Sequence, residues 1–276
     1  MRELERTAAD STDPSMAATA DGRGTRSDHT PLRVGIVGRG RVGGVLARAL
    51  REAGHQVTGP AGRGETPSGD AVLLCVPDSE IEAAAATVAG SAAFVGHTSG
   101  ATPLAALGDA GPPAFGLHPL QTIAGPDAVL RGCGCAVAGS TPAALDLARR
   151  LAADLGMHAV EIADEDRAAY HAAASIASNF LLTLESTAEA VAGGAGIEPA
   201  AARRLLGPLV RTTVENWLAL GPERALTGPV ARGDERTVAA QRTAVADAAP
   251  ELLPLFDELV ERTRALAGAR LPEVVA

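Results

Sequence analysis

Short apolar runs alternate with helical patterns over the first part of the chain. The pattern predicts strands at residues 33–37, 56–58, 71–76, 92–96, 114–117 and 135–138, with helices at 43–53 and 79–88. Short strands that are apolar on both faces and separated by helices are typical of a parallel sheet covered on both sides. This part of the chain is therefore predicted to have an α/β fold.

After about residue 163 the pattern changes to long helices. The spacing of apolar residues predicts helices at 166–192, 198–220, 235–248 and 250–267. Residues 1–30, in contrast, are rich in Ala, Ser, Thr, Asp and Gly without apolar periodicity, which is typical of a disordered segment. The expected organisation is a disordered tail at 1–30, an α/β domain with a parallel sheet at 31–163 and an all-helical domain at 164–276.

The first strand runs directly into a loop with three spaced glycines. In a dinucleotide-binding loop the first glycine permits a tight turn, the second lets the backbone approach a pyrophosphate, and the third lets the helix pack on the strand. The following helix N-terminus favours negative charge. The sequence therefore predicts a Rossmann-type nucleotide domain, and the residues expected to bind the cofactor are Gly38, Arg39, Gly40, Arg41, Val42 and Gly43.

The end of the second strand favours NADP over NAD. An NAD site has an acid about 20 residues past the glycine loop that holds the ribose hydroxyl, but residues 58–62 contain none. Arg63 follows, and an arginine there suits the 2′-phosphate of NADP, with Arg39 or Arg41 as helpers. Glu65 is close enough to keep NAD as an alternative.

Further polar residues follow the later strands, at the sheet edge where cofactors lie. Val76, Pro77 and Ser99 are expected to contact the cofactor, and His97 and His118 are expected near its nicotinamide. A histidine in such a place is equally compatible with a purely structural role.

The first long helix carries a polar stripe, because His171, Ser175 and Asn179 are spaced i, i+4, i+8. The stripe either forms a hydrogen-bond network between packed helices or lines a cleft, and we favour the cleft. Trp217 on the second long helix is expected in the core or in an interface. The loop at 226–234 is too polar and glycine-rich for a simple connector, so Arg232 and Asp234 in it are either site residues or an ion pair that pins the loop.

Composition excludes several classes of function. A net charge of −9 and a content of one Trp, one Tyr and four Phe argue against nucleic acid as a partner. No apolar stretch is long enough to cross a membrane and no signal peptide is recognisable, so a cytoplasmic location is expected. No residue set completes a zinc site with Cys133 and Cys135, so no metal is expected. All 24 basic residues are arginine, which excludes a catalytic lysine.

Together with the glycine loop, several motifs resemble those of one bacterial family: Val76-Pro77-Asp78, His97-Thr98-Ser99-Gly100, 117–122, 170–174, Ser178-Asn179 and 226–234. These are Rossmann-like proteins with a helical C-terminal domain of unknown function, related to ketopantoate reductase, pyrroline-5-carboxylate reductase and the 6-phosphogluconate and 3-hydroxyacid dehydrogenases. In ketopantoate reductase a lysine and two asparagines have the spacing that His171, Ser175 and Asn179 have here. His118-Pro119 resembles the His-Pro pair of prephenate and arogenate dehydrogenases, which also have a serine near the nicotinamide, where Ser99 falls.

The resemblance implies an NADPH-dependent oxidoreductase that reduces a small 2-oxo acid, as ketopantoate reductase does. His171 is the first candidate for the acid that protonates the substrate and His118 the second, while Ser175 and Asn179 would polarise the carbonyl. The substrate would be bound by Thr227, Arg232 and Asp234, with the arginine gripping its carboxylate. The alternatives are an imine reductase of specialised metabolism and a non-catalytic NADP-binding regulatory protein. The helical domain is expected to bind substrate and to form a homodimer.

Overall fold

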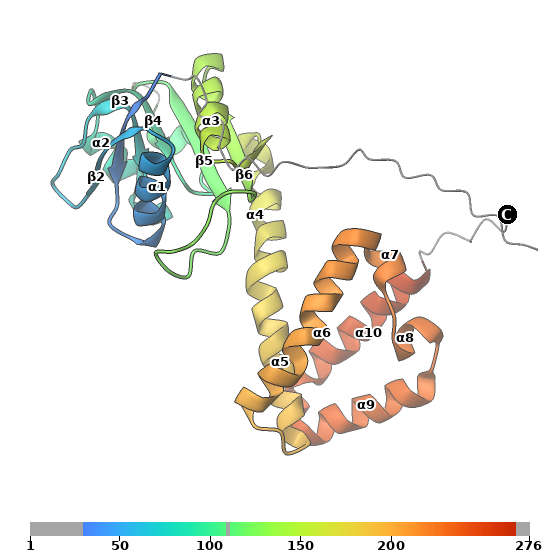
Figure 1. Cartoon of the computed structure of the whole chain (residues 1–276). Helices are drawn as coiled ribbons and strands as arrows, with labels where there is room; N and C mark the ends of the chain where they lie inside the picture. The colour runs from blue at the N-terminus through green and yellow to red at the C-terminus, as the bar shows by residue number, and fades with distance from the viewer. Residues whose placement is uncertain (1–29, 109–110, 269–276) are drawn as a thin grey trace, which may run out of the picture.

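The computed structural model describes residues 30–108 and 111–268. The tail expected at 1–30 therefore lies outside the described residues, apart from Thr30. The described chain forms a sheet part and a helical part that lie side by side and are joined by one long helix (Figure 1). Within the described residues no helix is both long and apolar enough to cross a membrane.

The sheet part contains seven strands and three α-helices within the described residues. In chain order they are β1 (Arg33–Val37), α1 (Arg41–Glu52), β2 (Gln56–Ala61), β3 (Gly69–Leu74), α2 (Ile81–Thr87), β4 (Ala92–His97), β5 (Ala114–Leu120), β6 (Gly134–Gly139), α3 (Pro142–Asp154) and β7 (His158–Glu161). Short 3₁₀ turns lie at Asp78–Glu80, Leu104–Leu107 and Asp164–Asp166. The strand order across the sheet is β2-β1-β3-β4-β5-β6-β7.

The α/β fold and the Rossmann-type arrangement are confirmed, with one difference in strand direction. Strands β1 to β5 are mutually parallel, whereas β6 pairs antiparallel with β5 and β7 pairs parallel with β6. The expectation that the strand at 135–138 continues the parallel sheet is wrong. A parallel neighbour needs a crossover connection, usually a helix, and between β5 and β6 the chain has only a loop.

Helices cover both faces of the sheet, as the apolar strands predict. On one face α1 and α3 pack against β1 and β5 in a core that includes Leu46, Leu151 and Phe115. On the other face α2 packs through Ile81 against a second core that includes Leu74. Because successive side chains of a strand point to opposite faces, both cores draw on the same strands.

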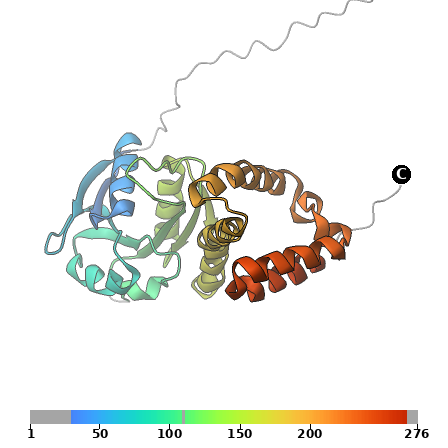
Figure 2. The same cartoon turned by 90° about the horizontal axis from the view of Figure 1, so that it is seen from below.

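The helical part begins directly after β7 and its following 3₁₀ turn. It contains α4 (Arg167–Ser175), a π-helical segment η4 (Ile176–Phe180), α5 (Leu181–Gly194), α6 (Pro199–Leu220), α7 (Pro222–Ala225), α8 (Pro229–Arg232), α9 (Glu235–Ala248), a 3₁₀ turn (Pro250–Leu252) and α10 (Leu253–Gly268). α4, η4 and α5 form the long helix that leads away from the sheet, and Figure 2 shows α8 far from the sheet in a second view.

The helical part buries few of its own side chains. Its buried residues are Arg167, Ala202, Val238, Val245, Ala249 and Val260. Large apolar residues on η4, α5 and α6 are instead exposed, among them Ile176, Phe180, Leu182, Leu205, Leu209, Trp217 and Leu218. Trp217 is 52% exposed, so it is not in the core of a single chain.

Candidate functional site

The glycine loop has the geometry of a phosphate-binding turn. Gly38 has φ +110°, and a Cβ there would lie 2.2 Å from the carbonyl oxygen of Cys75. A Cβ at Gly43 would lie 2.0 Å from the carbonyl oxygen of Gly38. A Cβ at Gly40, in contrast, would meet nothing within 4 Å. Gly38 and Gly43 therefore serve the turn and the helix packing, while Gly40 leaves open space before α1 that fits a cofactor phosphate.

One cavity lies beside this loop, at the carboxyl ends of β1, β2 and β3. It has a volume of about 430 Å³, and its lining includes Gly38, Arg39, Arg63, Val76 and Pro77, which the sequence predicts as cofactor contacts. Both arginines are paired with acids that also line it: Arg39 with Glu65 at 2.6 Å and Arg63 with Glu80 at 2.9 Å. The cavity therefore combines apolar walls with two guanidinium groups that suit an anionic nucleotide.

A second cavity brings together all four predicted catalytic residues. It has a volume of about 560 Å³ and is lined by His118 at the end of β5 and by His171, Ser175 and Asn179 on α4 and η4. Arg41, the first residue of α1, also lines it, so the cavity reaches the glycine loop. The polar stripe thus faces a cavity instead of a packed neighbouring helix. The π-helical segment η4, which follows Ser175 and contains Asn179, widens the helix at this point.

His118 is fixed by a partner that sequence reasoning did not select. Its Nδ1 lies 2.8 Å from the hydroxyl oxygen of Tyr170, and the two rings meet edge to face. The imidazole lies against Gly100, where a Cβ would be 2.7 Å from its Cε1. Burial, with smaller contributions from His171 and Arg167, lowers the pKa of His118 to about 4. Burial raises the pKa of Tyr170 to about 12.

These pKa values limit which of the two residues can donate the proton in the hydrogen bond between them. At neutral pH both groups are uncharged, so the phenol donates to an unprotonated Nδ1 or accepts from a protonated one. The phenol has a single proton and no other acceptor among the described residues. We therefore assign the donor role to Tyr170, which leaves the remaining proton of His118 on Nε2.

The loop after β4 supports this cavity from behind. His97 is fully buried and its Nδ1 accepts from the amide of Ser99, so it is structural and does not line the cavity. The Ser99 hydroxyl is 2.8 Å from Asp78 Oδ2 and accepts from the amide of Thr102 at 2.9 Å. Ser99 is only 7% exposed, so its hydroxyl serves the loop and does not face open space.

Arg167 connects this loop to the start of the helical part. The residue is 3% exposed, and its Nε donates to Asp164 Oδ1 at 2.6 Å. Its Nη1 is 3.4 Å from the carbonyl oxygen of Ser99, a long contact. Because a buried guanidinium needs such partners, the first turn of α4 is held against the sheet edge, and Tyr170 and His171 follow on the same helix.

The predicted substrate-binding residues lie elsewhere. Thr227, Arg232 and Asp234 belong to the segment around α8, and none of them lines the cavity of the histidines. Asp234 caps α9 by accepting from the Thr237 amide at 3.1 Å and from its hydroxyl at 2.7 Å. The hydrogen bonds from Thr237, and to a smaller extent the charge of Arg232, lower the pKa of Asp234. Arg232 itself does not line the cavity of the histidines within one chain. The physical reason is that α8 packs on α9 and α10, far from the sheet.

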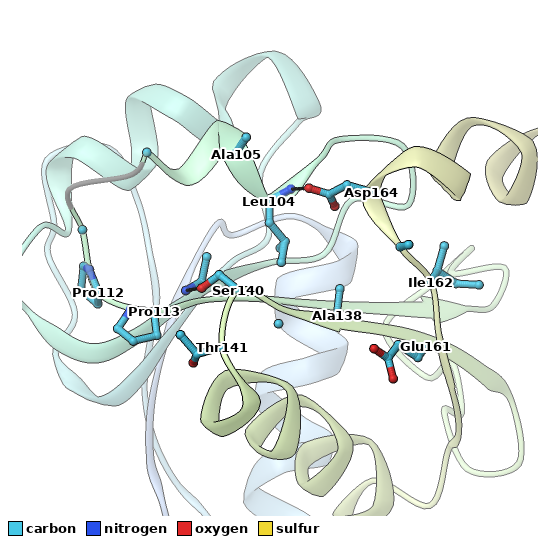
Figure 3. A pocket seen from close by; sticks show the side chains of 15 residues that line it. Leu104, Ala105, Pro112, Pro113, Ala138, Ser140, Thr141, Glu161, Ile162 and Asp164 are labelled. Atoms are coloured by element: carbon cyan, nitrogen blue, oxygen red, sulfur yellow. Dashed lines mark hydrogen bonds between the residues drawn. The ribbon is translucent and has the colours of Figure 1, made fainter.

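A further cavity, of about 580 Å³, lies between residues 104–108 and 111–114 on one side and the turn from β6 to α3 on the other (Figure 3). Its polar groups already have partners within the fold. The Ser140 hydroxyl accepts from the Ala114 amide, and Asp164 accepts from the Leu104 amide. This cavity therefore offers little to a polar ligand. No group of three or more metal-binding side chains is found among the described residues.

The sequence analysis assigned no site role to three residues that shape the site, although two of them lie in its motifs: Tyr170, Asp78 and Arg167. Tyr170 begins the motif 170–174, directly precedes His171 and is the single tyrosine of the chain, which are the signals that could have marked it as a site residue. Asp78 follows Val76-Pro77 at a strand end and could have been selected by the same argument as Ser99. Arg167 could not be selected from the sequence, because one of its partners, Ser99, comes from the loop after β4.

Comparison with known proteins supports the expected relationship. Residues 133–263 match the family model of a domain of unknown function, DUF2520. This match and the structural similarities confirm the resemblance to Rossmann-like proteins with a helical C-terminal domain of unknown function. No curated protein matches the chain significantly.

Three solved structures illustrate the shared fold. A protein from Bacteroides fragilis, provisionally described as an NADP oxidoreductase, is 18% identical with a TM-score of 0.72, and the match covers 85% of this chain and 98% of that one. Protein TM1727 from Thermotoga maritima is 24% identical with a TM-score of 0.70, covering 86% and 100%. The 1-pyrroline-5-carboxylate reductase of Streptococcus pyogenes is 12% identical with a TM-score of 0.58, covering 85% and 99%.

Proposed function

We propose that the protein is an NADPH-dependent oxidoreductase that reduces a small 2-oxo acid, in the manner of ketopantoate reductase. One observation carries this proposal: Arg41 at the glycine loop and the four polar residues His118, His171, Ser175 and Asn179 line a single cavity. Ligands of parallel α/β sheets bind at this edge. The description of the Bacteroides fragilis relative as an NADP oxidoreductase supports the choice of cofactor class.

The cofactor would be held along the carboxyl edge of the sheet. Gly40 and the first turn of α1 would bind the pyrophosphate, and Arg39 and Arg63 would bind the 2′-phosphate of NADP. Val76 and Pro77 would pack on the adenosine side, in the cavity that they line. When bound, the reduced nicotinamide supplies the hydride.

His171 is the proposed proton donor to the substrate oxygen. It is exposed on the cavity, and its ring centroid lies 6.3 Å from that of His118. His118 is a poor source of a proton at neutral pH, since burial lowers its pKa to about 4. In its neutral form it can still donate a hydrogen bond through Nε2, as neutral imidazoles do at other carbonyl-polarising sites.

Ser175 and Asn179 are proposed to orient and polarise the substrate carbonyl. Within one chain the carboxylate of the substrate would be bound by Arg41, the arginine that lines the cavity. Thr227, Arg232 and Asp234 could bind substrate only if a second copy of the chain brings them to this cavity.

A homodimer is also part of the proposal. The helical part buries few residues and exposes the large apolar side chains of Phe180, Leu209 and Trp217. Such an exposed apolar surface is typical of a subunit interface. If a second copy covered this surface, the apolar side chains would be removed from water. Each Å² of apolar surface buried in this way would stabilise the dimer by about 25 cal/mol. We propose that the dimer functions in the cytoplasm.

Two alternatives remain. Reduction of an imine is favoured by the similarity to 1-pyrroline-5-carboxylate reductase, whose named substrate is a cyclic imine. The second alternative is a regulatory protein that binds NADP without turnover. Such a protein would need no proton donor, so it would give the cavity of the histidines no role.

The test is an assay of a panel of substrates at a fixed NADPH concentration. The panel contains ketopantoate, other branched 2-oxo acids and cyclic imines, and turnover is measured as the loss of nicotinamide absorbance. Turnover of a 2-oxo acid supports the proposal, and turnover of an imine alone supports the first alternative. NADPH binding in a thermal-shift assay without any turnover would favour the regulatory alternative.

A further inference from the structure

The carboxylate of Glu65 occupies an anion-binding arrangement just beyond the end of β2. Its Oε1 accepts from Arg39 Nη2 at 2.6 Å, and its Oε2 accepts from the backbone amide of Gly62 at 2.9 Å. The Gly62 amide and the Arg39 charge lower the pKa of the Glu65 carboxyl group below its usual value. This position therefore stabilises a negative charge through one guanidinium and one amide.

The arrangement belongs to the proposed cofactor cavity. Arg39, Gly62 and Glu65 all line the cavity of about 430 Å³ beside the glycine loop. The guanidinium of Arg39 lies against Gly62, where a Cβ would be 3.2 Å from its Cζ, and its Nε is directed to the Pro60 carbonyl oxygen at 3.4 Å. Arg39 is thus oriented by the chain at the end of β2 as well as by Glu65.

The end of β2 is also the place where the ribose of a bound dinucleotide is recognised. A 2′-phosphate needs the same kind of partners that the Glu65 carboxylate has, namely a planar guanidinium and backbone amides. The two anions cannot share one donor set, because like charges at hydrogen-bonding distance repel each other.

We propose that Glu65 is a specificity-determining residue whose carboxylate holds the position of the NADP 2′-phosphate and must be displaced when that phosphate binds. The proposal rests on the proposed cofactor site but not on turnover. Its consequence is that Glu65 weakens the binding of any nucleotide with a 2′-phosphate and leaves nucleotides with a free 2′-hydroxyl unaffected.

The same cavity provides a matched control. Glu80 pairs with Arg63 at 2.9 Å, but Arg63 is 91% exposed at its side chain and no backbone amide donates to the Glu80 carboxylate in the described hydrogen bonds. Both acids are partly exposed, and Gln replaces either with little change of shape. Only Glu65 has the amide and guanidinium together.

The experiment measures binding by calorimetry for the wild type, Glu65→Gln, Glu65→Ala and Glu80→Gln. The probes are NADPH, NADH, 2′,5′-ADP and 5′-AMP. We expect both Glu65 variants to bind NADPH and 2′,5′-ADP about fivefold to tenfold more tightly and 5′-AMP unchanged. Glu80→Gln, which releases only the exposed Arg63, is expected to tighten the binding of NADPH and 2′,5′-ADP by less than about twofold and to leave that of 5′-AMP unchanged.

Other outcomes overturn the proposal. Unchanged or weaker binding of 2′,5′-ADP to the Glu65 variants would show that the carboxylate does not hold the phosphate position. Weaker NADH binding to both variants would instead make Glu65 a ligand of the ribose hydroxyl of NAD, and absence of binding by every probe would remove the cofactor site itself. The predicted affinity changes without any reductase turnover would contradict the proposed function and leave this inference standing.

Discussion

Nδ1 of His118 lies 2.8 Å from the hydroxyl oxygen of Tyr170, and this contact joins the end of β5 to the first turns of α4. It connects the sheet part with the helical part at the candidate site. Because the phenol donates to Nδ1, the neutral His118 is held as the Nε2–H tautomer. In the proposed mechanism the two neighbouring histidines therefore have different roles: His118 is a neutral hydrogen-bond donor, and His171 is the source of the proton.

Replacing Tyr170 with Phe removes the hydrogen bond and keeps the ring. Since the phenol stabilises the neutral imidazole, its loss is expected to raise the pKa of His118 from about 4, while burial still keeps it below the usual 6.5. We expect kcat/KM to fall by about tenfold, equivalent to about 1.4 kcal/mol. Titration of the histidine resonances by NMR measures the pKa, and an unchanged value would show that Tyr170 does not set the state of His118.

Replacing His171 with Ala is expected to lower kcat by about 10²-fold or more with the affinity for NADPH changed less than twofold. The reason is that His171 faces the cavity but lies on α4, away from the glycine loop. His158→Ala is the matched control, because His158 is exposed on β7 and is expected to leave both values unchanged. Equal turnover in His171→Ala would remove this residue from the mechanism.

Local sequence predicted the strand, glycine loop and helix at residues 33–53, because the turn depends on glycines that are adjacent in the chain. It did not predict α3 or β7. All four residues of β7 are exposed, so they carry no alternation of apolar and polar positions. The direction of β6 depends on the absence of a crossover helix, which residue pattern alone did not reveal.

In the candidate site, too, features set by local sequence could be predicted and features set by tertiary packing could not. The stripe His171, Ser175, Asn179 could be predicted, because helical periodicity places its members on one face. The contact between His118 and Tyr170 could not, since the two residues are 52 positions apart and meet only when the sheet and the helix pack. The position of Arg232 outside this cavity could not be predicted either, since the position of α8 depends on its packing on α9 and α10.

Stability is expected to fall as the pH falls from about 6.5 to 4. Burial, followed by the charge of Arg167, lowers the pKa of His97 to about 4, and burial also lowers that of His118 to about 4. The folded protein therefore binds fewer protons than the unfolded chain in this range, and each histidine costs about 2 kcal/mol of unfolding free energy at pH 5 relative to pH 7.5. Urea unfolding at these two pH values measures the difference.

The variants His97→Gln and His118→Gln each remove one of these titrations. Each is expected to reduce the loss between pH 7.5 and pH 5 by about 2 kcal/mol, whatever its stability at pH 7.5. His158→Gln, on the exposed strand β7, is the control and should show the wild-type loss. A loss that is the same in all three variants and the wild type would contradict the neutral state assigned to the buried His97 and the partly buried His118.

The three glycines of the loop are expected to differ in their response to alanine. Gly38→Ala and Gly43→Ala place a Cβ 2.2 Å and 2.0 Å from backbone oxygens, so both should lower the unfolding temperature or prevent folding. Gly40→Ala meets no atom within 4 Å and should keep the wild-type unfolding temperature within a few degrees while weakening NADPH binding. Full NADPH affinity in a folded Gly40→Ala protein would show that the cofactor backbone does not approach this residue.

Charged residues on the exposed apolar helices are expected to separate the dimer. Phe180 is 56% exposed and Trp217 is 52% exposed, so the double variant Phe180→Glu, Trp217→Glu should be a folded monomer at micromolar concentration. Val160→Glu is the control, because Val160 is 58% exposed but lies on the sheet part. Light scattering after size-exclusion chromatography measures the mass, and a monomeric wild type would contradict the proposed homodimer.

The central claim is that this chain transfers hydride from NADPH to a small carbonyl substrate. The most direct test incubates the protein with NADPH that carries deuterium at both hydrogen positions of nicotinamide C4, together with ketopantoate and other branched 2-oxo acids. The account predicts a 2-hydroxy acid that has gained one deuterium on the former carbonyl carbon, measured by mass spectrometry, and much less of it with His171→Ala. Unlabelled product, or no 2-hydroxy acid from any of these substrates although NADPH binds, would contradict it.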